Sequence, residues 1–439
     1  MVAGADILDD ESITSFITNI IGGLITSANA AERRQATVRT LRSVVFVFFL
    51  IEVLGLTFSI AVSSIAFGCA AIAWIALMVA SGSWRDIKGT PLDWFFLAYV
   101  AAEVLSATFA LDKTTALMNL KRLLLIGNVY IAMSTLSSER RVMTFLGTLI
   151  GFTTLLTIFE IVDYFAAHLG RLSIFQHYMT AGGIEMMLLL LTLPFILHTN
   201  TPPSVRVAAF LCVLPHFAAL LLTFTRSSWL GLLGGAIFIA AFRSKYIVLA
   251  IVLCVILFLL LAPLPLRERA YSIVSLSDPS NATRLRMWKT GLRIFADHPL
   301  LGIGDTDVRD VYMRYTTPLE PAEGGHLHNN LVQLLVTLGL VGLTSVVALF
   351  VKMFLVELKI VRQLRQDWFA GSVALGALAA FIGFQINGIF EWNFGDHEVA
   401  VLLWSTVGLA LAVDAIRSGQ RLSQSASTTV VTEKRGNLH

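Results

Sequence analysis

The sequence is poor in charged residues. Of its 439 residues only 14% are Asp, Glu, Lys or Arg, whereas 56% are hydrophobic. A soluble globular domain carries about 25% charged residues, so a cytosolic enzyme and a disordered scaffold are both excluded. The 32 Lys and Arg residues against 29 Asp and Glu leave a net charge of +3, which is too balanced for a nucleic-acid binder that relies on a basic patch. The composition is that of a polytopic membrane protein.

Cysteine is scarce as well. Cys69, Cys212 and Cys254 lie inside apolar runs, and no Cys-x-x-Cys or Cys/His spacing suggests a zinc site. We expect all three to be small buried hydrophobic residues. The first residues, MVAGADILDDES, lack a basic region, so we expect no cleavable signal peptide and insertion through the chain's own helices.

Apolar runs long enough to cross a membrane recur along the chain. A span needs about 20 apolar residues, and residues 43–81, uncharged except for Glu52, are long enough for two spans with a turn near Ser63 and Ser64. Twelve spans are predicted in total. They are two within 43–81 and one each at 92–109, 120–136, 142–165, 176–198, 205–224, 228–242, 246–263, 329–351, 370–390 and 398–416.

The distribution of Lys and Arg orients these spans. Most of these residues fall on one side of the membrane if both termini are placed in the cytoplasm, as the positive-inside rule requires. We expect residues 12–34 to lie on the membrane surface. The predicted organisation is a cytoplasmic or interfacial segment (1–42), transmembrane helices 1–9 (43–263), a large outer loop (264–327), transmembrane helices 10–12 (328–416) and a disordered cytoplasmic tail (417–439).

The outer loop contains a predicted basic amphipathic helix that ends at His298-Pro299. Its apolar residues recur at helical spacing and its basic residues fall on another face. Such a helix suits the membrane–water interface, or alternatively packs against the bundle with its charges in solvent. The apolar stripe consists of Leu285, Trp288, Leu292 and Phe295, and the basic face of Arg286, Lys289 and Arg293.

Two histidines, His326 and His328, end the loop, and an apolar run follows at once. The positive end of a helix dipole favours the neutral imidazole at such a position. Neutral imidazole accepts a proton, so His328 is a candidate general base. The alternative is a polar helix cap made with Asn329. A metal on the two histidines is disfavoured because no third ligand is spaced to match.

Arg226 is the other unusual residue, because it interrupts two apolar runs. A charge inside the bilayer costs about 2.5–3.5 kcal/mol, so such residues usually face a cavity or a partner. We place Arg226 at the outer level, with His328 and the arginines of the loop helix. Lys121 and Arg122 are further candidates, or else anchors at the membrane surface. The structural alternative for Arg226 is an ion pair with Glu103, Glu160, Asp163 or Glu185.

Arginines that converge with a neutral histidine suit one chemistry. Arginine binds phosphate oxygens bidentately, and the histidine can deprotonate a hydroxyl, so the set predicts transfer from a membrane-bound diphosphate to an alcohol. Asp305-Thr306-Asp307 matches a short metal–diphosphate pattern, but an acidic cap after a glycine turn explains it too. We therefore expect arginine, not a metal, to stabilise the leaving group.

Motifs in the C-terminal half resemble those of the O-antigen ligases of Gram-negative bacteria. They comprise Arg226-Ser227, then Arg284 with Trp288, His298-Pro299, Gly302 and Gly304, then His328-Asn329 with Gly339 and Gly342, and last Gly395-Asp396-His397-Glu398. From the residues alone, Gly339 and Gly342 are expected to allow close helix packing.

The resemblance implies a fold, a location and a reaction. The fold is an all-α polytopic integral membrane protein of the bacterial inner membrane, with about twelve transmembrane helices and one large periplasmic loop containing amphipathic helices. The reaction is the metal-independent, cofactor-free and inverting transfer of O-antigen polysaccharide from undecaprenyl diphosphate to a sugar hydroxyl of lipid A–core, at the periplasmic face.

Residue roles follow from the same resemblance. His328 would be the general base. Arg226 and Arg284 would bind the diphosphate and stabilise it as it leaves, with Arg286 a less secure second. The sequence does not separate Arg284 from Arg286, because both could face the site after a small rotation. Possible additional site residues are Lys121, Arg122, His326 and Asn329.

Other functions remain open at this stage. The same superfamily contains O-antigen polymerases, which use the same donor, and protein O-oligosaccharyltransferases, which usually carry a larger C-terminal periplasmic region. The His-Asn motif favours a ligase over a polymerase. A transporter of a lipid-linked glycan would instead depend on the intramembrane carboxylates Glu52, Glu103, Glu160 and Glu185.

Overall fold

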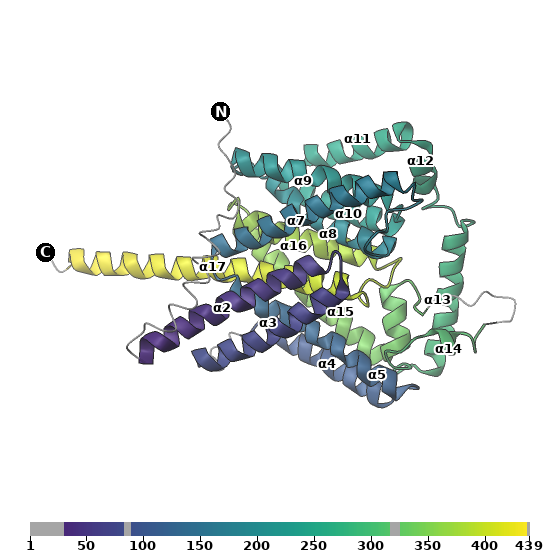
Figure 1. The fold of residues 1–439 in the computed structure, drawn as a ribbon, viewed down its shortest axis with the longest axis horizontal. Coiled ribbons are helices and arrows are strands. Elements are labelled where there is room, and N and C mark those ends of the chain that lie inside the picture. The colour runs from purple at the N-terminus through teal and green to yellow at the C-terminus, as the bar shows by residue number, and fades with distance from the viewer. Residues whose placement is uncertain (1–29, 83–88, 317–324, 437–439) are drawn as a thin grey trace.

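The structure is a computed structural model that describes residues 30–82, 89–316 and 325–436, with side chains described as far as residue 420. In this part of the chain every regular element is a helix (Figure 1), which confirms the all-α prediction. The fold class is therefore the one that the resemblance implies.

Three helices form the centre of the bundle: α8 (Tyr178–Leu197), α16 (Ala370–Asn387) and α17 (His397–Gly436). In each of them 83% of the most apolar stretch is buried inside the protein, against 22% for α3 (Ile60–Ser81) and α9 (Pro203–Leu222) at the rim. Glycines allow the close packing, since a Cβ on Gly231 would come within 2.7 Å of the Gly383 carbonyl oxygen. Such small-residue contacts are the usual way in which helices pack in lipid.

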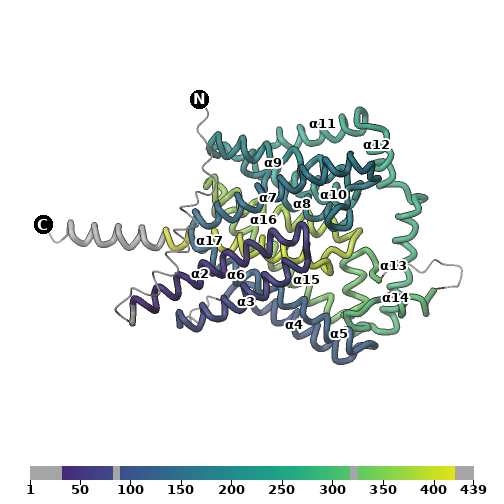
Figure 2. Tube along the Cα trace, viewed as in Figure 1, coloured from purple at the N-terminus to yellow at the C-terminus, as the bar shows by residue number. Residues whose placement is uncertain are grey.

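The other helices surround this centre (Figure 2). They are α2 (Ala30–Gly55), α4 (Asp93–Thr108), α5 (Lys113–Asn119), the 3-10 helix η2 (Leu120–Ile126), α6 (Gly127–Thr135), α7 (Glu139–Ala166), α10 (Arg226–Arg243), α11 (Lys245–Leu261) and α15 (Asn330–Leu364). The outer loop supplies α12 (Leu264–Tyr271), α13 (Pro279–Asp297) and α14 (Arg309–Tyr312).

Helices occupy all twelve places where a span is predicted, but the count of twelve spans is not confirmed. In the described residues eight helices are long and apolar enough to cross a membrane, or nine if α11 and α12, bent by 116°, form one span. The first turn lies at 56–59 and not at Ser63 and Ser64, which belong to α3. The Ser59 hydroxyl accepts a hydrogen bond from the Val62 N–H and thereby starts α3 earlier.

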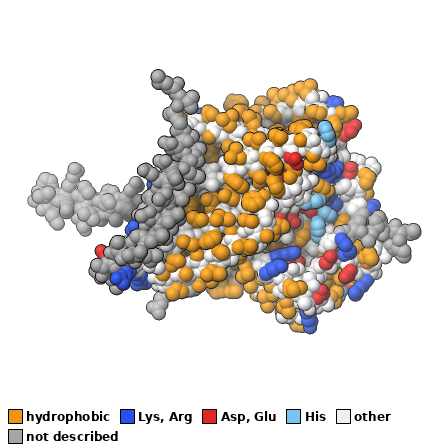
Figure 3. All heavy atoms as spheres, viewed as in Figure 1, with side chains coloured by type: hydrophobic (Ala, Val, Ile, Leu, Met, Phe, Trp, Pro, Cys, Tyr) orange, Lys and Arg blue, Asp and Glu red, His pale blue; other side chains and the backbone are white. Residues whose placement is uncertain are grey.

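Apolar side chains cover most of the face seen in Figure 3, and charged and histidine side chains gather at the end where α13 and α14 lie. The prediction that the cysteines are buried is wrong for all three. Cys254 is exposed, and Cys69 and Cys212 are half-buried. Each lies on a helix at the apolar rim, where a thiol contacts the same surroundings as its hydrophobic neighbours.

The C-terminal end of α17 lies opposite α12–α14 (Figure 1). In the middle of α17, Arg417 forms ion pairs with Glu139 and, at 2.6 Å, with Asp367. The folded part of the chain therefore includes residue 417, at which the predicted tail starts. The tail itself stays a prediction, and the predicted surface segment 12–34 falls almost wholly outside the described residues.

Helix α15 is broken at Gly339, where the backbone has φ +64° and ψ −164°. The segment 299–304 of the outer loop docks into this break. The Leu340 N–H donates to the Pro299 carbonyl at 2.9 Å, and the Gly304 N–H donates to the Thr337 carbonyl at 2.8 Å. Gly339 was predicted to allow close packing between helices. Instead, it lets the outer loop bind the helix that follows His328.

Helix α13 is present as predicted and is capped at His298, but its packed face differs from the predicted stripe. Met287, Gly291 and Ile294 are buried, whereas Leu285 and Leu292 are 40% and 51% exposed. Of the predicted stripe, Trp288 turns inward, and its indole N–H donates to the Leu327 carbonyl at 3.0 Å. The small Gly291 and the segment after Leu327 determine which face packs.

Substitution of Gly339 by alanine should destabilise the protein. Its conformation is one that glycine alone adopts readily, and a Cβ would lie 2.4 Å from the Leu300 backbone. We expect a loss of about 2–4 kcal/mol and a clearly lower melting temperature in detergent. Gly68→Ala, within α3 and with nothing within 4 Å, is the control and should leave stability unchanged or slightly higher. Equal melting temperatures for the two variants would contradict the role of the break.

Candidate active site

The Glu391 side chain is the centre of the site. It lies in the segment 388–396 between α16 and α17, and it is 5% exposed. His326 Nε2 lies 3.2 Å from its Oε1 and His328 Nδ1 lies 3.0 Å from the same oxygen. Arg284 Nη2 is 4.0 Å from Oε2. One buried carboxylate thus holds together the loop that ends in the two histidines and helix α13.

His328 is the group best placed to exchange a proton. Its side chain is 22% exposed, and its Nδ1 faces both oxygens of Glu391, at 3.0 and 3.1 Å. With the Nδ1 proton donated to the carboxylate, Nε2 carries the free lone pair that accepts a proton. Its backbone has φ +47°, a conformation that costs a residue other than glycine about 1–3 kcal/mol and that concentrates at functional sites.

His326 and Asn329 flank this residue in different roles. The His326 ring lies 4.3 Å from the His328 ring, centroid to centroid, and shares Glu391. Asn329 caps α15, because its Oδ1 accepts from the Val332 N–H at 2.9 Å while its Nδ2 donates to the Ile389 carbonyl. The alternative reading of the motif as a helix cap is therefore correct for Asn329 and leaves His328 available.

Three side chains here could bind a metal ion, although their spacing in the sequence does not indicate it. Ligand atoms of His326, His328 and Glu391 all lie within 4.8 Å of one another, and three nitrogen or oxygen ligands are the number that catalytic zinc sites use. The predicted lack of a third ligand is thus wrong, since Glu391 supplies it from a distant part of the chain.

The Asp-x-Asp pattern does not form a pair of metal ligands. Asp305 Oδ2 binds Arg122 Nη1 at 2.8 Å, whereas Asp307 accepts a hydrogen bond from the N–H of Arg309, the first residue of α14. The N-cap of α14 is Val308, so Asp307 stands one residue before the cap. Arg122 is paired with Asp305 and lines a different pocket from Arg226.

Arg226 is 7% exposed at the start of α10. None of the four predicted carboxylates is its ion-pair partner; that partner is Asp278, 3.1 Å away in the outer loop. The Ser272 carbonyl and the Asn281 side-chain oxygen accept further bonds, at 2.8 and 3.0 Å. The predicted ion pair is absent because the outer loop folds back over the N-terminal end of α10. Asp278 of that loop pairs with Arg226 instead.

Arg284 shares a small pocket of about 40 Å³ with Arg226. Its Nε donates to the Phe390 carbonyl at 3.0 Å and its Nη1 to the Ser280 hydroxyl at 2.6 Å. Arg286 does not line this pocket; it points into solvent and donates to Thr283. The structure thus separates the two arginines that the sequence left equivalent.

A third arginine of this pocket, Arg269, is missed by sequence analysis. It lies on α12, and its Nε donates to the carbonyl of Phe224 at 2.9 Å. Phe224 comes just before Arg226 in the chain. Phe224 itself has φ +51°, a strained conformation for a residue other than glycine. Because Arg269 stands in a short segment without clear periodicity, no sequence signal sets it apart. We call the set Arg226, Arg269 and Arg284 the arginine pocket.

The charged side chains of the site shift one another's pKa values. Burial alone would raise the pKa of Glu391, but its hydrogen bonds from His326 and His328 outweigh burial and keep that pKa well below its usual range. Burial opposes charge on His326, yet the bond to Glu391 raises the His326 pKa above its ordinary value. Burial and the nearby Glu391 charge raise the pKa of Asp396 to about 7.

The fold and the site together define a class: a multi-pass helical membrane protein with a histidine–carboxylate pair beside an arginine-lined pocket at one end of the bundle. Residues 208–347 match the family model described as O-antigen ligase. The match spans Arg226, Arg284 and His328, so this part of the chain is similar to a family that covers both O-antigen ligases and polymerases. A comparison with curated proteins gave no match.

Replacing Glu391 by glutamine should lower the pKa of His326. The variant keeps the shape but removes the negative charge that offsets burial, so the pKa of His326 should fall and the neutral ring should persist to lower pH. Titration of labelled histidines by NMR in nanodiscs, with His326 assigned by its own substitution, measures this. Glu160→Gln, on α7, is the control. An unchanged titration of His326 in Glu391→Gln would show that the carboxylate does not set its charge.

Proposed function

We propose that this protein is an O-antigen ligase that transfers polysaccharide from undecaprenyl diphosphate to a sugar hydroxyl of lipid A–core, at the periplasmic face of the inner membrane. The observation that carries the proposal is the placement of His328 on Glu391, with the arginine pocket on the other side of the same carboxylate. The family match supports the pathway, and the apolar bundle supports a multi-pass membrane location.

His328 acts as the general base. Its Nδ1 proton stays on Glu391, and its Nε2 takes the proton of the acceptor hydroxyl as that oxygen attacks the anomeric carbon of the donor sugar. The bond from the anomeric carbon to the diphosphate oxygen breaks, and the electron pair leaves with undecaprenyl diphosphate. Attack opposite the leaving group inverts the anomeric configuration. Glu391 is a positioning residue that fixes the ring and stabilises the imidazolium once it forms.

The arginine pocket stabilises the leaving diphosphate. Arg226, Arg269 and Arg284 present guanidinium groups whose geometry matches phosphate oxygens. The pocket of about 40 Å³ has room for one or a few water molecules, so a diphosphate must first displace Asp278 from Arg226. The Asp278 carboxylate therefore positions Arg226 until the diphosphate binds.

The reaction needs no metal in this proposal, because the arginines supply the charge that a cation would otherwise bring. Dialysis against EDTA should leave the ligation rate of the purified protein unchanged, measured as transfer of labelled polymer from its lipid carrier. Added Zn²⁺ should inhibit, because occupation of His328 Nδ1 and Glu391 removes the base from its working state. Loss of activity on chelation, restored by one divalent ion, would overturn the metal-independent scheme.

A transporter would need carboxylates that form a continuous path. Instead, in the described residues Glu52 binds Asn128, Glu103 binds Tyr99, and Glu185 binds His216 at 2.5 Å. Only Glu160 and Glu185, of these four carboxylates, line one common pocket. This arrangement favours the enzyme over the transporter.

His328→Ala should abolish ligation in a strain that lacks the gene. A general base contributes about 10²–10⁴ in rate, so the lipopolysaccharide gel should show bare core while lipid-linked polymer accumulates. His168→Ala is the matched control, because His168 is an exposed histidine with φ +49° outside the site, and it should restore the full ladder.

The same gel decides between the two activities of the family. Core that carries a single repeat unit in the deletion strain would mean a polymerase. A normal ladder from well-expressed His328→Ala would overturn the catalytic role of His328 and favour the transporter.

A further inference from the structure

A second, larger cavity borders the same segment 388–396 as the arginine pocket. It has a volume of about 480 Å³, within the range of small-molecule sites. Phe390 lines the arginine pocket, Trp392 lines the large cavity, and Glu391 stands between them in the chain. The segment thus contributes to the walls of two compartments. Gly395 and His397 of the last motif and the candidate residues Lys121 and Arg122 line the larger one, but the resemblance assigns it no ligand.

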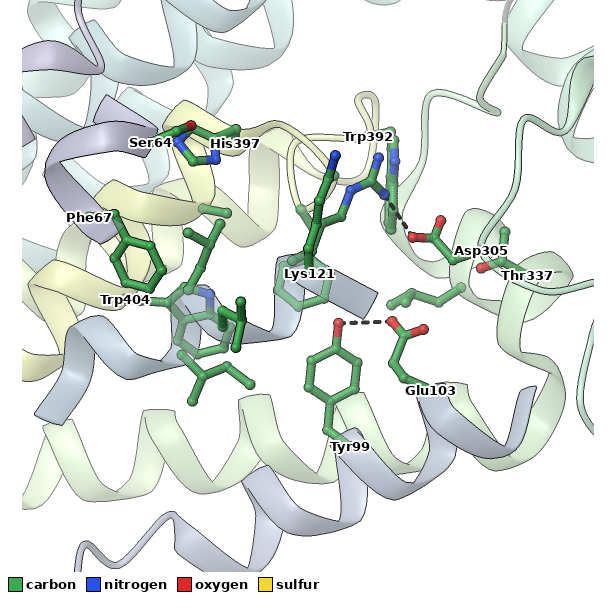
Figure 4. Close-up of a pocket in the computed structure, with 18 of the residues that line it drawn as sticks. Ser64, Phe67, Tyr99, Glu103, Lys121, Asp305, Thr337, Trp392, His397 and Trp404 are labelled. Atoms are coloured by element: carbon green, nitrogen blue, oxygen red, sulfur yellow. Dashed lines mark hydrogen bonds and ion pairs between the residues drawn. The ribbon is translucent and has the colours of Figure 1, made fainter. Parts of the chain in front are cut away.

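The walls of the cavity are mainly apolar. Figure 4 shows Phe67 and Trp404 on one side and Lys121, Trp392 and Asp305 on the other. The outer residues Ile60 and Leu124 are 49% and 64% exposed, so the cavity opens toward the apolar surface of the bundle and is accessible to a lipid.

One side of the cavity carries positive charge. Lys121 and Arg122 both lie on η2, a seven-residue 3-10 helix between α5 and α6. Runs of this length are uncommon, and inside a longer helical stretch they often mark functional positions. Arg122 is paired with Asp305, whereas the exposed Lys121 shows no hydrogen bond or ion pair among the described residues, so its ammonium group can bind an anion.

Polar groups face the interior below this charge. The Tyr99 hydroxyl donates to Glu103 at 3.0 Å, and both side chains line the cavity with Thr337 of α15. Carboxylate and hydroxyl oxygens of this kind accept hydrogen bonds from sugar hydroxyls. A cationic rim, a polar floor and apolar walls together suit a glycolipid with a phosphorylated head group.

We propose that this cavity binds the acceptor, with the phosphorylated sugar of lipid A–core at Lys121 and its acyl region against the apolar walls. The proposal rests on the proposed ligase function. Inversion requires the acceptor hydroxyl and the leaving diphosphate to lie on opposite sides of the anomeric carbon. The arginine pocket borders Phe390 and the cavity borders Trp392, the two chain neighbours of Glu391, so a separate compartment is available to each lipid.

Lipid binding to the purified full-length protein tests this assignment. The probes are diphosphoryl lipid A, lipid A without phosphates, and undecaprenyl diphosphate, titrated by native mass spectrometry from detergent. Ala400→Trp fills the cavity, because Ala400 lines it and is 5% exposed. Lys121→Glu reverses the rim charge on an exposed side chain and so preserves the fold. Leu257→Trp and Lys245→Glu, both exposed on α11, are the matched controls.

We expect both cavity variants to weaken diphosphoryl lipid A at least tenfold and to change undecaprenyl diphosphate binding less than twofold. Lys121→Glu should affect lipid A without phosphates much less, and Arg284→Ala should show the reverse selectivity between the two lipids. Weakened undecaprenyl diphosphate in the cavity variants would assign the cavity to the donor and overturn the proposal. Unchanged lipid A binding in both variants would overturn it too.

The gel separates failure of the inference from failure of the function. If the deletion strain still makes a normal ladder while Ala400→Trp loses lipid A, the cavity is a lipid A site and the ligase assignment is wrong. If His328→Ala abolishes ligation while both cavity variants bind lipid A normally and restore the ladder, the ligase assignment stands and the cavity assignment is wrong.

Discussion

A carboxylate removed from water must be satisfied from within the protein, and the site depends on how the Glu391 carboxylate meets this condition. An unpaired buried charge costs several kcal/mol, so the native state brings donors to it from distant segments. The loop that ends at His328 and the helix that carries Arg284 are both held at its two oxygens. In the proposed mechanism, the same contact fixes the tautomer of the base and the position of an anion-binding arginine. Structure and proposed chemistry therefore depend on one charge.

The break in α15 is the second constraint. A helix that ran straight through Gly339 would leave the backbone of 299–304 without partners, and unpaired peptide groups are not tolerated near lipid. The broken helix presents its freed groups to this segment, and Ser106 of α4 adds bonds to the Leu301 and Thr337 carbonyls. The outer loop is thus attached to the bundle by backbone hydrogen bonds. Gly302 and Gly304 of one motif and Gly339 of another lie at this attachment.

The sequence predicted what depends on local pattern. Apolar runs located the helices, and the His-Asn motif located the candidate base and its neighbouring cap. Long-range partners could not be predicted: Asp278 for Arg226, Arg269 in the same pocket, and Glu391 for both histidines all come together through folding. Glu391 follows an apolar span directly, where an acidic residue looks like an ordinary helix end. The packed face of α13 also depended on a partner segment, which periodicity does not reveal.

The position of Glu391 in the chain has a consequence for biosynthesis. Arg284 and His328 are made before the segment 388–396, and both have a partner in that segment in the finished protein. A chain still emerging from the ribosome therefore holds the proposed base and Arg284 without the segment that aligns them. On the proposed mechanism, the chain becomes reactive only after residues 388–396 have been made and folded.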